Sequence, residues 1–328
     1  MEIKVSVIIP FYNVEPFIGR CVRSLMEQTL REVEFLFVDD ASPDGSSEIV
    51  RKVTAEYDRS VRILTHSRNR GLPAARNTGL SEAKGEYIYH CDSDDYMEPS
   101  LLEDLYGAAQ AAEADYAYCD FFLDFGTSRR QMVNPTYERP EQMIKEGFLA
   151  GLMKYNVWNK LVRRSLYEQT PLLRFPEGYS MGEDMTMIIL ATRATRTVHI
   201  PVPLYHYMKT NAAAFTNTFS ERHLAEIRFN ADRTLKVIGE WPVADKERYM
   251  AFFQLNIKLP FLLSGSYRQY RLWHSWFPQA NRFIPQNTHL PRRTRMVQQW
   301  AAWHLFPLVW LYGFSVNHLY YRLLHRDK

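Results

Sequence analysis

Short apolar runs alternate with amphipathic stretches along the first part of the chain. The runs are rich in β-branched and aromatic residues, as expected for strands that are buried on both faces of a sheet. They are Val5 to Pro10, Val33 to Asp39, Val61 to Thr65, Glu86 to Cys91 and Tyr116 to Phe121. Helical patterns lie between them, at Pro16 to Gln28, Ser46 to Tyr57, Leu72 to Ala83 and Ser100 to Ala112. This alternation predicts an α/β domain with a mainly parallel, Rossmann-like sheet and helices on both faces.

Helix and strand patterns return after a polar, proline-containing stretch between Asp124 and Glu146. The predicted elements are helices at Phe148 to Tyr155 and Asp184 to Ala194, a strand at Trp158 to Arg163 and an extended segment at Val198 to Tyr207. Beyond Phe219 the pattern is helical and rich in Arg, Phe, Trp and Tyr. We therefore predict a sheet-containing domain over residues 1–215 and a helical C-terminal region over residues 216–328.

The composition narrows the class of protein. With 46% hydrophobic residues, the 328-residue chain has the material for a large core, and disorder is excluded. Its three cysteines are an odd number without a close pair, which indicates a reducing compartment and offers neither a disulfide framework nor a zinc cluster. No basic and apolar leader opens the chain, so we expect a cytoplasmic protein.

Two acidic clusters follow predicted strands. Asp39 ends the second strand and Asp40 follows it, and Asp92, Asp94 and Asp95 follow the fourth strand. Because ligands bind beyond the carboxyl ends of the strands in such sheets, we expect both clusters in one crevice. Strand side chains alternate between faces, so Asp92 and Asp94 are expected to point the same way. A hard divalent cation that also binds phosphate oxygens would relieve the repulsion between these charges, although a solvated acidic turn is the simpler alternative.

The segment from Asn69 to Gly79 has the features of a loop that opens a helix. Gly71 permits a positive φ, and Leu72 and Pro73 begin the helical pattern. The amide groups of such a helix start can bind a phosphate or a base. Arg76 lies in the first turns, where it contacts a ligand or, alternatively, pairs with a carboxylate at the surface.

Several motifs follow one another in a fixed order along the first two thirds of the chain. They are Ser6 to Asn13, Ser24 to Thr29, Val38 to Ser42, Asn69 to Gly79, Asp92 to Asp95, Trp158 to Leu161 and Gly182 to Asp184. In order and spacing they closely resemble the motifs of the family 2 glycosyltransferases, which have the GT-A fold. Many relatives of this kind assemble envelope or capsule polysaccharides. The resemblance extends over roughly residues 3 to 215.

The resemblance implies that the N-terminal domain binds a nucleotide-diphosphate sugar, with UDP as the nucleotide. Asp40, with Asp39 beside it, matches the aspartate that binds the uracil. The other implied nucleotide-sugar-binding positions are Pro10, Tyr12, Arg76, Asp92 and Ser93. Asp92 and Asp94 match the Asp-x-Asp pair, and Asp94 is expected to bind Mg²⁺ or Mn²⁺ that bridges the diphosphate.

The same resemblance implies the catalytic and acceptor residues. Asp184 matches the catalytic base, with Glu183 as its neighbour, and Trp158 and Asn159 match the stretch beside the acceptor. A carboxylate that accepts the proton of the attacking hydroxyl acts as a general base. One base and one displacement invert the configuration at the sugar. Without the resemblance, Asp184 is better explained as the cap of the helix that follows.

One departure from the family pattern falls on the diphosphate side. Many relatives have an arginine soon after the stretch that matches Tyr205 to Tyr207, and this chain has Met208 and Lys209 there. Lys209 can supply the charge without the guanidinium's two-pronged geometry, or it is a solvated loop residue. His206 is either a further metal ligand or a structural histidine.

The C-terminal region favours a membrane surface as partner. Residues 290–328 hold six basic residues against Asp327 alone, a net charge of +5 that leaves −2 for the rest of a chain whose total is +3. Residues 300–321 hold no Asp, Glu, Lys or Arg, but Pro307, Gly313 and several Trp and Tyr favour a helix in the membrane plane over a spanning one. The alternative is packing on the protein as a lid or dimer contact. Nucleic acid is excluded as a partner, because the basic charge is not spread over the main domain.

These observations predict an inverting glycosyltransferase at the inner face of the cell membrane, whose acceptor is a glycan or a lipid-linked sugar. Two other classes remain open. A sugar nucleotidyltransferase also uses strand-end aspartates and a metal, but a glycine-rich basic loop is expected where this chain has Phe11, Tyr12 and Asn13. A non-catalytic scaffold that binds nucleotide-sugars is the other class, and the intact Asp92, Asp94 and Asp184 count against it.

Overall fold

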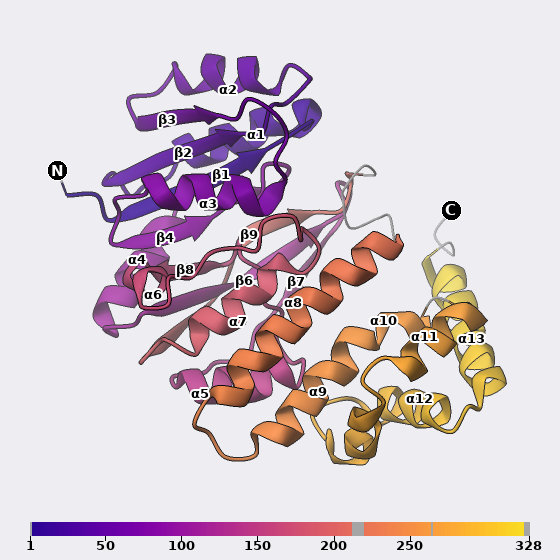
Figure 1. Cartoon of the computed structure of the whole chain (residues 1–328). Helices are drawn as coiled ribbons and strands as arrows, with labels where there is room; N and C mark the ends of the chain where they lie inside the picture. Colours follow the sequence, from indigo (N-terminus) through magenta and orange to yellow (C-terminus); the bar gives the residue numbers. More distant parts are fainter. Residues whose placement is uncertain (1, 212–219, 264, 325–328) are drawn as a thin grey trace. The chain divides into compact units, whose positions relative to one another are not determined.

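The computed structural model describes residues 2–211, 220–263 and 265–324. The chain divides into two compact units (Figure 1). The first comprises Met1–Gln142 and Tyr155–Thr234, and the second comprises Met143–Lys154 and Leu235–Lys328. The division falls inside α8 (Glu221–Glu240), so one helix contributes to both units.

One mixed sheet of nine strands forms the centre of the first unit. Its order is β3-β2-β1-β4-β8-β6-β9-β5, with β7 paired to β6 outside this path. The first four strands are parallel neighbours: β3 (Ser60–Thr65), β2 (Val33–Asp39), β1 (Val5–Phe11) and β4 (Tyr87–His90). The remaining strands are β8 (Lys160–Arg163), β6 (Tyr116–Asp124), β9 (Thr197–Met208), β5 (Tyr96–Met97) and β7 (Arg129–Met132). The predicted α/β fold with a mainly parallel sheet is confirmed.

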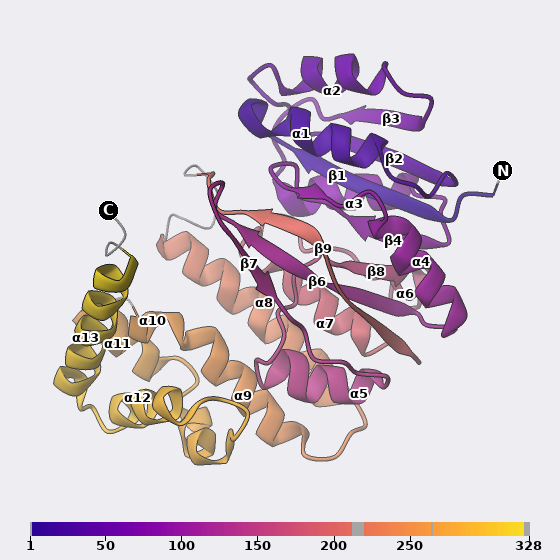
Figure 2. The ribbon, with the colours of Figure 1, turned by 180° about the vertical axis from the view of Figure 1, so that it is seen from behind.

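Helices cover both faces of this sheet, and its central strands are therefore buried throughout. All seven residues of β1 and all seven of β2 are buried. The helices are α1 (Glu15–Met26), α2 (Ser46–Thr54), α3 (Leu72–Glu82) and α4 (Leu101–Ala111). Figures 1 and 2 view the sheet from its two sides and show α3 on one face and α1 on the other.

The helix α3 approaches β1 closely at Gly79. A Cβ atom on Gly79 would lie 2.4 Å from Cγ2 of Ile8, closer than side-chain carbons pack. The glycine therefore allows α3 to pack closely against β1.

Two local predictions were wrong, and one strand was not predicted. Residues 91–95 form a turn after β4, so the alternation of strand side chains, from which Asp92 and Asp94 were expected to point the same way, does not apply to them. The helix predicted from Phe148 to Tyr155 is instead a π-helix, η1 (Met143–Leu149), followed by a turn. The polar stretch after Asp124 contains the edge strand β7, which an apolar pattern does not reveal because its residues are largely exposed.

The rest of the first unit carries the segments that complete its site. These are α5 (Pro140–Gln142), α6 (Ser165–Glu168), the 3-10 helix η2 (Glu183–Met185) and α7 (Thr186–Ala191). The predicted helix from Asp184 to Ala194 corresponds to η2 and α7 together. The predicted extended segment from Val198 to Tyr207 is β9.

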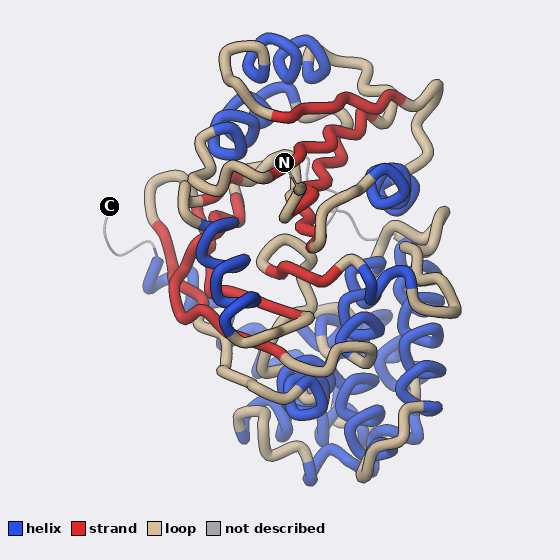
Figure 3. Tube along the Cα trace, turned by 90° about the vertical axis from the view of Figure 1, so that its left-hand side faces the viewer, coloured by secondary structure: helices blue, strands red, loops and turns tan. Residues whose placement is uncertain are grey.

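The second unit is built from helices, since every strand of the described residues lies in the first unit (Figure 3). Its helices are η1, α9 (Lys246–Lys258), α10 (Pro260–Leu263), α11 (Tyr267–Ser275), η4 (Pro278–Gln286), α12 (Arg292–Ala302) and α13 (Phe306–Leu324). The centre of the buried Trp273 ring lies 4.1 Å from Lys258 Nζ. This ammonium group also donates to the carbonyl of Trp276 at 2.8 Å. Within the described part of the chain, no helix is both long and apolar enough to span a bilayer.

Candidate active site

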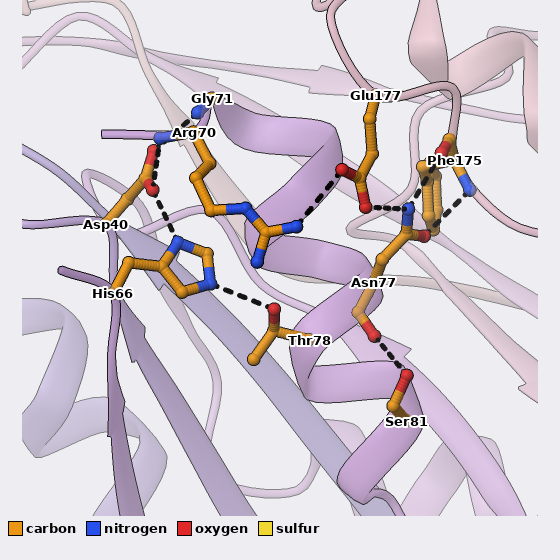
Figure 4. Close-up of polar contacts among 9 residues, drawn as sticks. All are labelled: Asp40, His66, Arg70, Gly71, Asn77, Thr78, Ser81, Phe175 and Glu177. Carbon is orange, nitrogen blue, oxygen red and sulfur yellow. Dashed lines mark hydrogen bonds and ion pairs between the residues drawn. The ribbon is translucent and has the colours of Figure 1, made fainter. Parts of the chain in front are cut away.

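The loop that opens α3 is held by Asp40, which follows β2. The backbone N–H of Arg70 donates to Asp40 Oδ1 at 2.8 Å, and that of Gly71 donates to Oδ2 at 2.7 Å (Figure 4). His66 Nδ1 lies 2.6 Å from Oδ1, and its Nε2 lies 2.9 Å from Thr78 Oγ1. Gly71 has φ 88°, the positive value expected for this glycine. Asp40 is 3% exposed, so one buried carboxylate fixes the start of α3.

The neighbouring residues line the carboxyl ends of β1 and β2. Asp39 is buried and accepts a hydrogen bond from the N–H of Ser42 at 2.8 Å. Pro10 lies inside β1 and is buried, whereas Tyr12 follows the strand and is 44% exposed. Of these candidate nucleoside residues, Tyr12 thus presents the most surface for a bound base.

The helix α3 and the loop before it also bind the segment that precedes η2. The side chain of Asn77 donates to the carbonyl of Phe175 at 2.8 Å and accepts from its N–H at 2.9 Å (Figure 4). Arg70 pairs with Glu177 at 3.1 Å. These bonds join residues about one hundred positions apart and bring the segment that leads to Glu183 against α3.

Arg76 connects α3 to two acidic segments. Its Nη1 donates to Glu183 Oε1 at 2.6 Å, and its Nη2 donates to Asp92 Oδ1 at 2.8 Å. The residue is 1% exposed, so the alternative that Arg76 is a surface residue is wrong. A guanidinium between two carboxylates compensates charges that would otherwise repel each other. Arg76 therefore holds the turn after β4 and the 3-10 helix η2 in one site.

The turn after β4 contains three carboxylates in different surroundings. Asp92 and Asp94 are half-buried, and Asn211 donates to Asp94 Oδ2 at 2.9 Å. Ser93 between them is buried. Asp95 is fully buried and accepts from Tyr205 Oη at 2.8 Å and from the N–H of Met208 at 2.7 Å.

Asp95 has a structural role that the sequence did not reveal. Burial, with Asp94 and Asp92 adding like charge, raises the pKa of Asp95 well above its usual value. Its two hydrogen bonds attach the acidic turn to β9. Burial also raises the pKa of Asp92, and Arg76 opposes that shift. The three aspartates therefore divide into one that fixes the turn and two that remain partly open to a ligand.

Glu183 and Asp184 lie in η2, after Gly182 in a left-handed conformation with φ 82°. Glu183 is buried against Arg76, and Asp184 is half-buried. Burial and the charge of Glu183 raise the pKa of Asp184 to about 8, against the opposing effects of Arg76 and Lys160. Among the described residues neither η2 nor α7 has a side-chain cap, so the alternative that Asp184 is only a helix cap is wrong.

The residues expected beside the acceptor are buried. Trp158 is 5% exposed and stacks on Tyr205 with ring centroids 4.5 Å apart. Asn159 donates to the carbonyl of Cys119 at 2.8 Å and accepts from Lys160 Nζ at 2.7 Å. Their side chains therefore support the site from the turn that precedes β8.

Lys160 is a site residue that the sequence analysis did not single out. It is 1% exposed, and its Nζ also donates to the carbonyl of Asn156 at 2.6 Å. Burial lowers the pKa of Lys160 to about 7, while Cys119 and Asp184 oppose the shift. A lysine directly after the Trp-Asn pair and before the apolar Leu161 and Val162 was the available signal.

His206 lies on β9, and Lys209 follows the end of this strand. Lys209 Nζ lies 4.1 Å from the centre of the Tyr207 ring, and burial lowers its pKa while Asp95 and Asp94 oppose the shift. Lys209 is exposed, as expected of a solvated loop residue, and the charges of Asp95 and Asp94 act on it. His206 Nε2 lies 2.8 Å from Glu98 Oε1, and its ring stacks on Tyr96 with centroids 4.1 Å apart. These contacts favour the structural alternative for His206.

The acidic turn offers donors suited to a divalent cation. Within the described residues, no group of three or more His, Cys, Asp and Glu side chains is arranged around a common metal position. Each of Asp92 and Asp94 has one carboxylate oxygen in a hydrogen bond, and among the described residues none engages Asp92 Oδ2 or Asp94 Oδ1. Mg²⁺ and similar ions bind proteins through one or two carboxylates together with phosphate oxygens. The donor set therefore fits a cation that binds with a diphosphate.

A mainly parallel sheet with acidic residues after β2 and β4, joined through α3 to a carboxylate pair before α7, defines the class of the GT-A glycosyltransferases. Comparison with known families gives the same answer, because the model of glycosyl transferase family 2 matches residues 6–172, which is half of the chain. The chain belongs to glycosyltransferase family 2. This assignment decides against the nucleotidyltransferase alternative.

Curated relatives agree with this assignment. The glycosyltransferase EpsJ of Bacillus subtilis (strain 168) is 37% identical over 212 residues, which cover 62% of this chain and 60% of EpsJ. EpsH of the same organism is 32% identical over 262 residues, which cover 78% of this chain and 70% of EpsH. The chain thus spans less than two thirds of the length of EpsJ.

Solved structures confirm the fold. Residues 1–349 of S. aureus TarS in complex with UDP superpose with a TM-score of 0.67 at 22% identity, covering 99% of this chain and 93% of that one. The complex of the same protein with UDP-GlcNAc gives a TM-score of 0.68 at 21% identity, with the same coverage. At this identity the likeness shows a shared fold. The predicted GT-A fold is therefore confirmed.

Proposed function

We propose that this protein is an inverting glycosyltransferase that moves a sugar from a UDP-linked donor to a hydroxyl group of a glycan or lipid-linked acceptor. The observation that carries the proposal is the pair of bonds from Arg76 to Asp92 and Glu183, because it joins the donor side and the catalytic side of one site. The family assignment supports the reaction, and the complexes of TarS with UDP and UDP-GlcNAc support the nucleotide.

The nucleoside of the donor is proposed to bind at the carboxyl ends of β1 and β2. Tyr12 offers an exposed ring for stacking, and the buried Asp39 and Asp40 lie at the end of the neighbouring strand β2. Since Asp40 already binds the N–H groups of Arg70 and Gly71, it also orients the loop that would close over the base. Pro10 is buried in β1 and supports the strand end from which Tyr12 follows.

The diphosphate is proposed to bind at the turn after β4. Asp94 and Asp92 would hold Mg²⁺ or Mn²⁺ there, with Ser93 between them, and the bound cation would neutralise charge that develops on the departing diphosphate. Lys209 lies close enough to Asp95 and Asp94 for their charges to affect its pKa, so it is placed to add positive charge on this side. Arg76 keeps Asp92 in position through its buried ion pair.

Asp184 is proposed as the general base. The acceptor hydroxyl donates its proton to the Asp184 carboxylate as its oxygen forms a bond to the anomeric carbon, and the bond from that carbon to the diphosphate breaks. A pKa of about 8 makes Asp184 a stronger base than an ordinary aspartate. Glu183, paired with Arg76, fixes η2 and thereby the direction of its neighbour. A single displacement converts an α-linked donor into a β-linked product.

The acceptor is proposed to approach from the side of Trp158 and Asn159, where these buried residues support the wall of the site. Residues 1–215 would carry the reaction, and the helical region from 216 to 328 would hold the enzyme at the inner face of the cell membrane. A lipid-linked acceptor lies at that surface, so attachment to the membrane would bring the enzyme to its acceptor.

Donor turnover tests this proposal. Release of UDP from UDP-GlcNAc and UDP-glucose would be measured with Mn²⁺ for the wild type, for Asp184→Asn and for the exposed control Asp232→Asn, whose partner is Arg228. We expect Asp184→Asn to lower turnover by about 10²- to 10⁴-fold, and Asp232→Asn to leave it unchanged. Equal rates for the wild type and Asp184→Asn would remove Asp184 as the base. Turnover of nucleoside triphosphates in place of UDP-sugars would overturn the proposed reaction.

A further inference from the structure

The helix α13 carries large apolar side chains on its outward side. Leu308, Trp310, Leu311 and Phe314 are 41%, 44%, 54% and 55% exposed, whereas Val309 on the opposite side is 1% exposed. A surface helix of a soluble domain buries its apolar stripe and exposes polar residues. In α13 one side is apolar and buried, as expected, but the exposed side is apolar as well.

Neighbouring segments extend this surface. Trp303 and Leu305, in the connection between α12 and α13, are 63% and 40% exposed. Tyr267 of α11 is 49% exposed, and its ring lies 6.1 Å from that of Phe306, the first residue of α13. We call these residues the α13 face: Tyr267, Trp303, Leu305, Leu308, Trp310, Leu311 and Phe314. Exposed apolar side chains gathered in this way mark a surface that binds a protein or a membrane.

The charge around the α13 face is of one sign. The helices α11, α12 and α13 contain six Arg residues and no Asp or Glu. Arg268 and Arg271 of α11 and Arg292 and Arg293 of α12 are exposed. Trp and Tyr at the headgroup level, leucines below it and arginines beside anionic headgroups are the features of a helix that lies in a membrane interface.

We propose that α11, α12 and α13 bind the surface of an anionic lipid bilayer, with α13 lying in the plane of the membrane. A second copy of this chain fits the α13 face less well, because it would bring two basic surfaces together without a carboxylate from residues 248–326 to compensate them. The proposal deepens the proposed function, on which it rests for the lipid-linked acceptor. The surface itself is argued from the second unit alone.

Vesicle flotation of the full chain tests the proposal. Vesicles of phosphatidylcholine with about 30% phosphatidylglycerol are compared with vesicles of phosphatidylcholine alone, in about 0.1 M and about 0.5 M NaCl. We expect the protein to float with the anionic vesicles in low salt and to bind at least about tenfold more weakly to the neutral ones or in high salt. A protein that stays unbound with anionic vesicles in low salt would overturn the proposal.

Substitutions on α13 test the apolar part with a matched control. The triple variant Leu308→Ser, Leu311→Ser and Phe314→Ser removes three exposed apolar side chains, and we expect it to bind anionic vesicles at least about tenfold more weakly. The control variant makes the same change at three exposed apolar positions of the first unit. These are Val133→Ser, Leu172→Ser and Val202→Ser, at residues 69%, 58% and 46% exposed. An equal loss of vesicle binding in both variants, or no loss of vesicle binding in the α13 variant, would contradict the proposal.

Two further measurements separate this proposal from its alternatives. If light scattering showed a wild-type dimer that the α13 variant dissociates, and the wild type did not bind vesicles, the face would be a protein interface and the proposal would be wrong. Turnover of a water-soluble UDP-sugar by the α13 variant is expected to equal that of the wild type. A wild type that binds vesicles but turns over no donor would contradict the proposed function and leave the membrane surface supported.

Discussion

At the scale of single residues, the buried ion pairs of Arg76 determine the geometry of the site. One guanidinium, 1% exposed, binds Asp92 and Glu183 from segments that are far apart in the chain. The sequence marked all three residues through their motifs, but nothing in a sequence pattern pairs residues 76 and 183. That pairing depends on how α3 and η2 pack in three dimensions.

Removing the Arg76 charge should destabilise the protein. We expect Arg76→Gln to lower the free energy of unfolding by about 3 kcal/mol or more, because it leaves Glu183 buried without a partner. The exposed pair of Arg228 and Asp232 provides the control, and Arg228→Gln should cost less than about 0.5 kcal/mol. Urea denaturation of both variants measures the difference. Equal and small effects would show that the Arg76 ion pairs do not stabilise the fold.

The raised pKa of Asp184 predicts two pH dependences. Turnover should rise with pH and level off above about 8, because only the deprotonated carboxylate accepts a proton. Stability should change in the opposite direction, since a proton bound more tightly in the folded state stabilises it at low pH. This stabilisation is complete below the ordinary pKa of 3.8, decreases as pH rises, and is lost above about 8.

Thermal unfolding of Asp184→Asn measures the second dependence. Because asparagine cannot become charged, the melting temperature of the variant relative to the wild type should increase between pH 5.5 and pH 9. A difference that stays constant over this range would show that the pKa of Asp184 is not raised in the folded protein.

At the scale of secondary structure elements, the position of α3 depends on glycine. We expect Gly79→Ala to destabilise the protein by about 1–3 kcal/mol, because its Cβ would overlap the side chain of Ile8. Gly107 of α4 is the matched control, since a Cβ there has no atom within 4 Å. Gly107→Ala should stabilise the protein by up to about 1 kcal/mol. Thermal unfolding that gave both variants the same sign would contradict the packing described for α3.

The sequence predicted the elements of the first unit better than their connections. Parallel strands such as β1 and β2 are buried on both faces, so their continuous apolar runs were easy to recognise. The edge strand β7 and the π-helix η1 were missed, because an exposed strand lacks an apolar pattern and a π-helix departs from the period of 3.6 residues. The alternation of strand side chains was extended to Asp92 and Asp94, although these residues lie in the turn after β4.

At the scale of the whole molecule, the sequence predicted a sheet domain followed by helices, and the structure adds two things. The first is that residues 143–154, inside the sheet domain by sequence, belong to the helical unit. The second is the direction of the apolar side chains on α13. Composition revealed an apolar, uncharged segment, but which of its residues are exposed depends on how α13 packs against its own unit.

The most direct test of the account is a calorimetric titration of UDP with Mn²⁺ into the wild type, Asp94→Asn and Asp184→Asn. In the proposed reaction the turn after β4 binds the donor diphosphate, while Asp184 acts on the acceptor. We therefore expect the wild type and Asp184→Asn to bind UDP with similar Kd, and Asp94→Asn to bind at least about tenfold more weakly, a loss of about 1.4 kcal/mol. Removing Mn²⁺ with EDTA should weaken binding to the wild type to a similar extent. No binding of UDP to the wild type, or equal binding to all three proteins with and without Mn²⁺, would contradict the account.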